Sequence, residues 1–180
     1  MASGSSQSLR RAEELDAPEL RALLNAAYAD LALAGRNYTA SYQDVGETLA
    51  QITSRRVFVH DDDDGLAGTI SVREENWFTG RRTAYIGKVA VRPDSKRKGL
   101  GGAMMDFVES LAAQEGFDGV QLDTAKPVDH LVAWYVRRGY RIVGETPLRG
   151  KDVRFLDLRK RPPGHRLLTG SRFTKHALGS

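Results

Sequence analysis

Apolar residues recur every three to four positions in the first third of the chain, which is the spacing of one helical face. This spacing predicts a helix that begins after Asp16, a residue type suited to an N-cap, and continues to Gly35. A short strand over 8–12 precedes it. A polar and aromatic loop over 36–42 leads to a second predicted helix over 43–54. The chain therefore opens with one short strand and two helices.

The period of the pattern then changes from helical to alternating. A strand begins at 57–59, a carboxylate-rich turn follows at 60–65, and a second strand covers 66–74. A further turn at 76–82 leads to a third strand at 83–92. Strands joined by short turns favour an antiparallel meander.

Helices and strands alternate in the second half of the chain. The pattern predicts a helix over 100–115, a strand over 119–124, a helix over 128–138, and strands over 140–146 and 152–158. A meander followed by a strand–helix–strand crossover predicts an α/β (α+β mixed) fold. We expect a central mixed, mostly antiparallel sheet of six to seven strands, flanked by about four helices.

The composition excludes several classes of protein. With 41% hydrophobic and 28% charged residues, the chain has the balance of a folded globular domain. No apolar run approaches the roughly 18 residues of a membrane span, and the first residues, MASGSSQS, do not resemble a secretory signal. The absence of cysteine excludes a disulfide framework, a thiolate zinc site and a cysteine nucleophile. We therefore expect a cytoplasmic protein with no membrane partner.

The length of 180 residues suits one domain. We predict a disordered leader at 1–7, a single domain at 8–160 and a basic C-terminal tail at 161–180. The net charge of +4 favours an anionic partner, and positive charge gathers at 96–98 and in the tail. The tail lacks interleaved aromatic and basic residues, and no helix-turn-helix pattern is present, so nucleic acid is disfavoured.

The segment 89–105, VAVRPDSKRKGLGGAMM, carries the strongest local signal. A β-branched strand stops at Pro93, a basic segment follows, and Gly99 and Gly101 open a helix. Helix N-termini present unpaired N–H groups, and glycine lets the backbone approach a ligand, so this turn favours a pyrophosphate. The segment is neither a Walker A loop nor the dinucleotide fingerprint G-x-G-x-x-G. The alternative is a purely structural glycine turn with solvated basic residues.

This segment resembles motif A of the GNAT (GCN5-related N-acetyltransferase) superfamily, in which a strand and a proline precede Arg/Gln-x-x-Gly-x-Gly/Ala and a helix. Lys96 stands where the family usually has Arg or Gln. A second signature, L-Y-x-x-x-G-F, is similar to the stretch from Trp134 and Tyr135 to Gly139 and Tyr140. The resemblance spans about residues 8–158.

The resemblance implies a GNAT-like fold with a sheet splayed at the cofactor site, and acetyl-CoA as cosubstrate. It implies direct attack of an amine on the thioester, whose carbonyl is polarised by a backbone N–H at or near Val89, with the pantetheine arm along that strand. The cofactor-binding residues that it implies are Val89, Ala90, Val91, Lys96, Arg97, Lys98, Gly99, Leu100, Gly101, Gly102 and Ala103.

Tyr135 resembles the family tyrosine that protonates the departing thiolate; the alternative is a tyrosine that packs at the edge of the core beside Trp134. No general base is assigned, because the family's common Glu is absent from the strand before motif A, and Glu74 and Glu75 also suit solvated turn positions. The family's common Asn falls at Val128. These departures leave a catalytically idle acyl-CoA-binding module as the alternative to an N-acetyltransferase.

The acceptor is expected to bear a primary amine, as a small molecule, peptide or protein, and a homodimer is compatible with the sequence. Tyr38 and Tyr42 lie in a loop that shapes the acceptor site in the resembling family. No metal site is predicted, because the carboxylates at 61–64 suit a hairpin tip and the histidines lack metal-ligand spacing.

Overall fold

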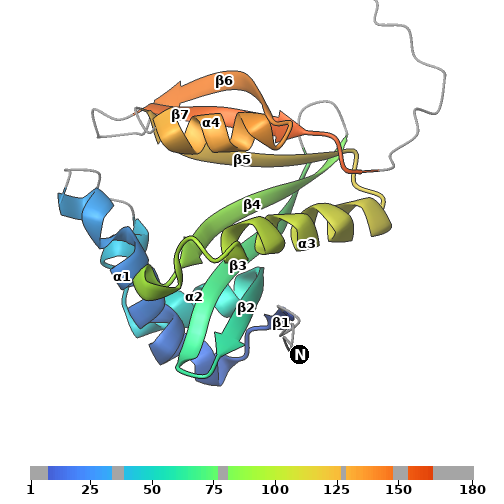
Figure 1. The fold of residues 1–180 in the computed structure, drawn as a ribbon. Helices are drawn as coiled ribbons and strands as arrows, with labels where there is room; N and C mark the ends of the chain where they lie inside the picture. The colour runs from blue at the N-terminus through green and yellow to red at the C-terminus, as the bar shows by residue number, and fades with distance from the viewer. Residues whose placement is uncertain (1–7, 34–38, 77–80, 127–128, 148–153, 164–180) are drawn as a thin grey trace, which may run out of the picture.

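A seven-stranded sheet forms the centre of the described part of the chain (Figure 1). The computed structural model describes residues 8–33, 39–76, 81–126, 129–147 and 154–163. The strands are β1 (Arg10–Arg11), β2 (Arg56–Asp62), β3 (Gly65–Asn76), β4 (Arg82–Val91), β5 (Gly119–Lys126), β6 (Arg141–Pro147) and β7 (Arg154–Lys160). The helices are α1 (Ala17–Leu33), α2 (Val45–Ser54), α3 (Leu100–Gln114) and α4 (Asp129–Arg137). The predicted leader, most of the predicted tail, Tyr38 and Val128 lie outside the described residues.

The strand order is β1-β2-β3-β4-β5-β7-β6. Strands β2, β3 and β4 form the predicted antiparallel meander, and β1 adds to it by antiparallel pairing with β2. Strands β5 and β6 each pair with β7 in antiparallel fashion, and β4 pairs with β5 in parallel. The prediction of a mixed, mostly antiparallel sheet of six to seven strands is thus confirmed.

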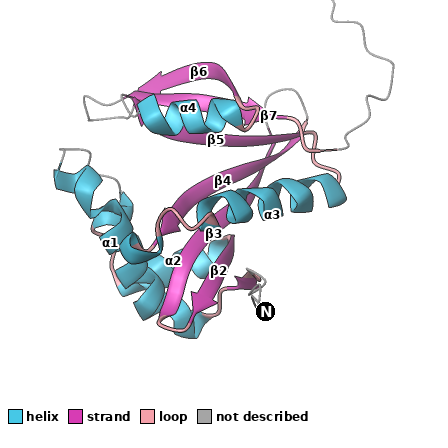
Figure 2. Cartoon of the chain, viewed as in Figure 1, coloured by secondary structure: helices cyan, strands magenta, loops and turns pink. Residues whose placement is uncertain are grey.

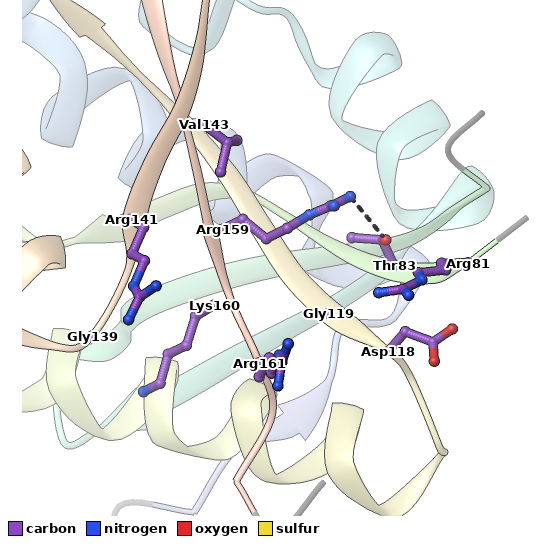
Figure 3. Close-up of a pocket in the computed structure, with 10 residues that line it drawn as sticks. All are labelled: Arg81, Thr83, Asp118, Gly119, Gly139, Arg141, Val143, Arg159, Lys160 and Arg161. Carbon is purple, nitrogen blue, oxygen red and sulfur yellow. Dashed lines mark hydrogen bonds between the residues drawn. The ribbon is translucent and has the colours of Figure 1, made fainter. Parts of the chain in front are cut away.

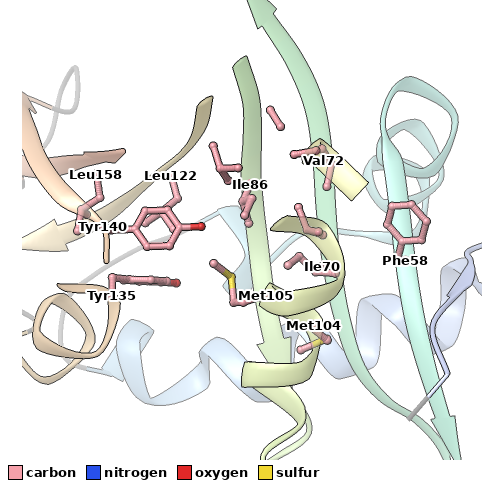
Figure 4. Close-up of a cluster of buried hydrophobic side chains, with 14 of the residues drawn as sticks. Phe58, Ile70, Val72, Ile86, Met104, Met105, Leu122, Tyr135, Tyr140 and Leu158 are labelled. Atoms are coloured by element: carbon pink, nitrogen blue, oxygen red, sulfur yellow. The ribbon is translucent and has the colours of Figure 1, made fainter. Parts of the chain in front are cut away.

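The helices cover both faces of the sheet (Figure 2). Alternation along β2 shows the division: Val57 and Val59 pack in a core cluster with α1 and α2, whereas Phe58 packs in a cluster with α3. The cluster that contains Phe58 and α3 also includes Tyr135 of α4 and Leu158 of β7 (Figure 4). Two hydrophobic cores, one on each face, therefore hold the sheet.

Helix α1 begins at Ala17, directly after Asp16 as predicted, but the contacts of Asp16 differ from those of a helix cap, and α2 begins later than predicted. Asp16 does precede α1, but its carboxylate accepts hydrogen bonds from the backbone N–H of Glu13 at 2.7 Å and from Arg10, and so closes the preceding 3₁₀ turn. Helix α2 begins at Val45, where Asp44 and Glu47 form a capping box. This capping box can be read from the sequence, and it makes α2 begin at Val45, two residues later than the predicted start at 43.

Gly68 allows the first turn of α3 to lie close to β3. A Cβ at this position would stand 2.9 Å from the Leu100 side chain and 3.2 Å from the Met104 sulfur. We expect Gly68→Val to lower the free energy of unfolding by about 1–3 kcal/mol, because overpacking would push α3 away from the sheet. Urea denaturation measures this. Gly101→Ala is the control, since its Cβ would meet only Val91, at 3.9 Å, and no loss of stability is expected.

None of the described helices combines the length and apolarity needed to cross a membrane.

Candidate active site

Strands β4 and β5 separate soon after they pair. Their parallel register joins Thr83 with Gly119, Ala84 with Val120 and Tyr85 with Gln121, and stops there. Beyond this point β4 keeps its pairing with β3, and β5 keeps its pairing with β7. The two strands visibly diverge in Figure 1. The separation leaves an edge of β4 to which an extended ligand can add in the manner of a strand.

A bulge interrupts β4 inside this separation. The register places Thr69 opposite Ala90 and Ser71 opposite Gly87, so two residues of β4 stand opposite one residue of β3. Lys88, the first of the two, has a φ of 48°, which is costly for a residue with a side chain. A bulge of this kind turns peptide groups out of the regular ladder. It therefore changes the direction of the backbone at the position where the resemblance implies a polarising N–H.

Neighbouring side chains hold the bulge on both sides. The Ser71 hydroxyl donates to the Gly87 carbonyl at 2.8 Å, and the Tyr28 hydroxyl of α1 donates to the Val89 carbonyl at 3.3 Å. These contacts tie the bulged peptides to β3 and to α1.

The N-terminus of α3 lies beyond the end of β4. Gly99 is its N-cap in the left-handed region, with a φ of 83° and no capping side chain. The N–H of Ala103 is the first that bonds within the helix, to the Gly99 carbonyl at 3.0 Å, so the amides of Leu100, Gly101 and Gly102 lack a helical acceptor. Arg97 also has a positive φ, of 66°. Amides at a helix start combine with the positive end of the helix dipole to attract an anion.

The loop before α3 is anchored by Arg92. Its guanidinium contacts Asp62 of β2 at 2.8 Å and Asp94 at 2.7 Å, and the backbone N–H of Ser95 bonds to the Arg92 carbonyl. Because Arg92 is engaged in this way, the charge offered to an anion comes from the exposed side chains at 96–98. The Leu100 side chain is buried in the core, so this residue has only its backbone to offer a ligand.

The ring of Tyr135 lies at the edge of the main core. It makes edge contacts with Trp134 at 4.9 Å and with Tyr140 at 5.8 Å between ring centroids, and only 7% of the residue is exposed. Figure 4 shows the ring reaching from α4 towards the side on which Ile86 of β4 and Met105 of α3 lie. The packing expected of a core-edge tyrosine is present, and the assignment of Tyr135 as an acid stays a prediction.

The two carboxylates considered from the sequence as bases are engaged by arginines. Glu74 accepts two hydrogen bonds from Arg82, at 2.9 and 3.0 Å, and Glu75 accepts from Arg73 at 2.8 Å. Both carboxylates are therefore paired with an arginine, and the hydrogen bonds from Arg82 lower the pKa of Glu74.

A third carboxylate, Asp123, lies where β4 and β5 separate. It is two residues beyond the last β4–β5 pair, and the Tyr85 phenol donates a hydrogen bond to it. Packing limits its hydration and raises the pKa of the carboxyl, although the side chain still reaches solvent; the hydrogen bond from Tyr85 acts in the opposite direction. Burial together with the neighbouring Asp123 also raises the pKa of Tyr85. The sequence reasoning missed this pair, because the register of two strands distant in sequence brings it together.

Lys88 extends from the bulge to Gln43, whose side chain is buried and donates to Thr48 at 2.6 Å. Burial lowers the pKa of Lys88 to about 8, and the charge of Arg55 adds to the shift.

Lys88 should make stability depend on pH. The pKa of Lys88 is about 8 in the folded protein, whereas a lysine has an ordinary pKa of 10.5. The free energy of unfolding should therefore rise as the pH increases from about 8 to 10.5. We expect Lys88→Met to flatten this rise. Urea denaturation of both proteins across this range measures the difference, and identical slopes would contradict the assignment.

A basic pocket of about 630 Å³ lies at the other end of β4 (Figure 3). Its lining comes from the starts of β4, β5 and β6 and from the end of β7. The residues are Arg81, Thr83, Asp118, Gly119, Gly139, Arg141, Val143, Arg159, Lys160 and Arg161. Positive charge thus gathers both at this pocket and at the loop 96–98, and of these two described regions the loop is the one that lies between the end of β4 and the N-terminus of α3.

The comparisons with known proteins agree with this architecture. The model of the acetyltransferase (GNAT) family matches residues 18–140. A search of curated proteins finds no match.

Similar solved structures share the fold at low sequence identity. One is yncA of Salmonella typhimurium, a putative acetyltransferase with its cofactor acetyl-CoA, at 17% identity and a TM-score of 0.69 over 90% of this chain and 97% of that one. The ribosomal-protein-alanine N-acetyltransferase of Brucella melitensis has 16% identity and a TM-score of 0.69, over 86% and 99%. A chimera of the Vibrio cholerae spermidine N-acetyltransferase SpeG with hSSAT has 18% identity and a TM-score of 0.68, over 87% and 96%.

Proposed function

Because the chain belongs to the GNAT acetyltransferase family, we propose that it transfers an acetyl group from acetyl-CoA to a primary amine by direct attack. One observation carries this proposal: β4 separates from β5, bulges at Lys88 and leads directly into a helix whose first amides lack acceptors. A free strand edge and a helix start with unpaired amides thus follow each other along one stretch of chain, and this succession supports the proposal.

The residues at the start of α3 suit a pyrophosphate. A Cβ at Gly99 would meet no atom within 4 Å, and one at Gly101 would meet only Val91, so the space beside these residues is open. The amides from Leu100 to Gly102 would donate to the phosphate oxygens, and the side chains at 96–98 would add charge.

The edge of β4 would hold the pantetheine arm along Val89–Val91, in the manner of an added strand. The bulged backbone at Val89 would supply the N–H that polarises the thioester carbonyl, a contact of the oxyanion type. Acetyl-CoA supplies an activated acyl carbon and a thiolate leaving group. Tyr135 would give its phenolic proton to the departing sulfur.

An amine is the acceptor class that the similar proteins support. Two of them are named as N-acetyltransferases, one of ribosomal-protein alanine and one of spermidine. We extend to this chain the class alone, a primary amine on a small molecule, peptide or protein.

A screen of amine acceptors with acetyl-CoA tests the proposal. Thiol release should be slow without an amine and faster with at least one acceptor, and CoA should raise the melting temperature. Stabilisation by CoA with no acceleration by any amine would instead indicate an acyl-CoA-binding module that does not catalyse transfer. No stabilisation at all would contradict the proposal.

A further inference from the structure

The basic pocket beside the start of β4 brings together cations from three places in the sequence (Figure 3). The cationic side chains that line it are Arg81, Arg141, Arg159, Lys160 and Arg161. Asp118 is the single carboxylate among the described residues of the lining, and it accepts a hydrogen bond from the backbone N–H of Arg82 at 3.1 Å. The lining therefore carries a formal excess of positive charge.

Most of this charge is not balanced by an ion pair elsewhere in the structure. Lys160 is the exception, because its ammonium contacts Glu109 at 2.6 Å. Within the described part of the chain, the exposed guanidinium groups of Arg81, Arg141 and Arg161 have no ion-pair partner. With Lys160 set aside, four arginines face one carboxylate, which leaves a formal excess of three positive charges.

Two of the arginines stand directly opposite each other in the sheet. Arg141 of β6 is the register partner of Arg159 of β7. Like charges at directly opposite positions of antiparallel strands destabilise the pairing. The hydrogen bonds that Arg159 donates to Gln121 at 3.4 Å and to Thr83 at 3.5 Å have neutral acceptors, so they position its guanidinium without removing the repulsion. An anion that contacts both arginines would turn this repulsion into attraction.

Two glycines keep the space beside the cations open. A Cβ at Gly119 would stand 3.7 Å from the Lys160 carbonyl oxygen and 3.8 Å from Nε of Arg159. A Cβ at Gly139 would stand 3.7 Å from the Lys160 side chain. A larger side chain at either position would extend over the cationic groups, so the glycines leave room for a ligand to reach them.

The chemistry of the lining favours phosphate groups on a small molecule. Arginine donates paired hydrogen bonds to phosphate oxygens, and its guanidinium is weakly hydrated. One phosphate group carries a charge of about −2 at most, which is less than the excess of the lining. The volume of about 630 Å³ suits a small ligand. No aromatic side chain is present in the described lining, so it offers no platform on which the bases of a nucleic acid could stack.

The pocket and the start of α3 lie at opposite ends of β4. Thr83 in the lining and Val91 at the end of the strand are eight residues apart, roughly 26 Å of extended backbone. A pyrophosphate bound at the start of α3 would therefore leave this pocket open.

We propose that this pocket binds a small molecule that carries two or more phosphate groups, at a site separate from the start of α3. The proposal goes beyond acetyl transfer and does not depend on it.

Calorimetric titration with inorganic tripolyphosphate tests the proposal. It is made on the wild type and on Gly101→Glu, whose added carboxylate disfavours phosphate at the start of α3, and one saturable site should persist in Gly101→Glu. Arg141→Gln and Arg161→Gln, each added to Gly101→Glu, should weaken this binding about tenfold or more, because each removes a charged hydrogen-bond donor. Arg137→Gln is the matched control, since this exposed arginine of α4 lies outside the lining and its substitution changes the charge equally.

Gly119→Val gives a second readout in which the charge of the protein stays the same. Its side chain would fill space beside Arg159, while its Cβ makes only ordinary contacts with the protein. We expect tripolyphosphate binding to weaken about tenfold or more, with a melting temperature close to that of the protein without this substitution.

Three results would overturn the proposal: no saturable binding of tripolyphosphate to Gly101→Glu, unchanged affinity in both Arg141→Gln and Arg161→Gln, or an equal loss in Arg137→Gln. Citrate binding as tightly as tripolyphosphate would contradict the assignment to phosphate. Tighter binding of a single-stranded RNA through the same two arginines would make the pocket part of a nucleic-acid surface and would also contradict it. Since neither acetyl-CoA nor an amine is present, each outcome is independent of the proposed acetyl transfer.

Discussion

Gly101→Glu is expected to weaken CoA binding by about 100-fold or more while the protein stays folded. A carboxylate at the second residue of α3 would place negative charge beside the amides of Leu100 and Gly102, where we propose that the pyrophosphate binds. The protein itself has room for the side chain, because a Cβ at this position meets only Val91, at 3.9 Å. An acidic side chain in the first turn also stabilises a helix, so the melting temperature should not fall.

Isothermal titration with CoA measures the change, and Gly101→Ala is the matched control. Alanine adds a Cβ without charge, so most of the affinity should remain. If Gly101→Glu binds CoA as tightly as the wild type, the pyrophosphate is not held at the start of α3.

Tyr135→Phe should lower kcat about 100-fold or more, with little change in CoA affinity. The substitution removes only the phenolic oxygen, and the ring contacts with Trp134 and Tyr140 remain. A proton donor that acts only on the departing thiolate contributes to the transition state and not to cofactor binding. Steady-state rates and CoA titration on the same protein separate the two effects.

Tyr140→Phe is the control for Tyr135→Phe. Tyr140 lies in the same cluster, and its hydroxyl donates to Glu109 at 3.1 Å; Glu109 is only 3% exposed and also contacts Lys160 at 2.6 Å. Removing this hydroxyl should cost about 1–3 kcal/mol of stability, without a specific loss of turnover. Equal losses of kcat and CoA affinity in Tyr135→Phe would contradict its role as an acid.

Local signals in the sequence were sufficient where neighbouring residues decide the structure. Pro93 and the glycines predicted that β4 would end and that a helix would begin near residue 100, and α3 begins at Leu100. The alternating period likewise predicted the meander. By contrast, Asp16 suited an N-cap by residue type, yet it bonds to Glu13 and Arg10, because Arg10 in β1 and the 3₁₀ turn lie within its reach.

The finer features of the site depend on contacts between residues distant in sequence. The periodicity of hydrophobic residues along the chain does not predict such contacts. The bulge sets a positive φ at Lys88, a residue type that does not favour it, because the registers with β3 on either side require an extra residue. Tyr85 and Asp123 belong to strands predicted correctly, but their meeting follows from where β4 and β5 stop pairing. The separation of these strands was expected from the resemblance and not from periodicity.

The most direct test of this account is a crystal structure of the protein with acetyl-CoA bound. We expect the pyrophosphate to lie against the amides of Leu100, Gly101 and Gly102, beside the side chains at 96–98, with the pantetheine arm along β4 towards the bulge. Acetyl-CoA phosphates found in the pocket lined by Arg141 and Arg161, with the start of α3 unoccupied, would contradict it.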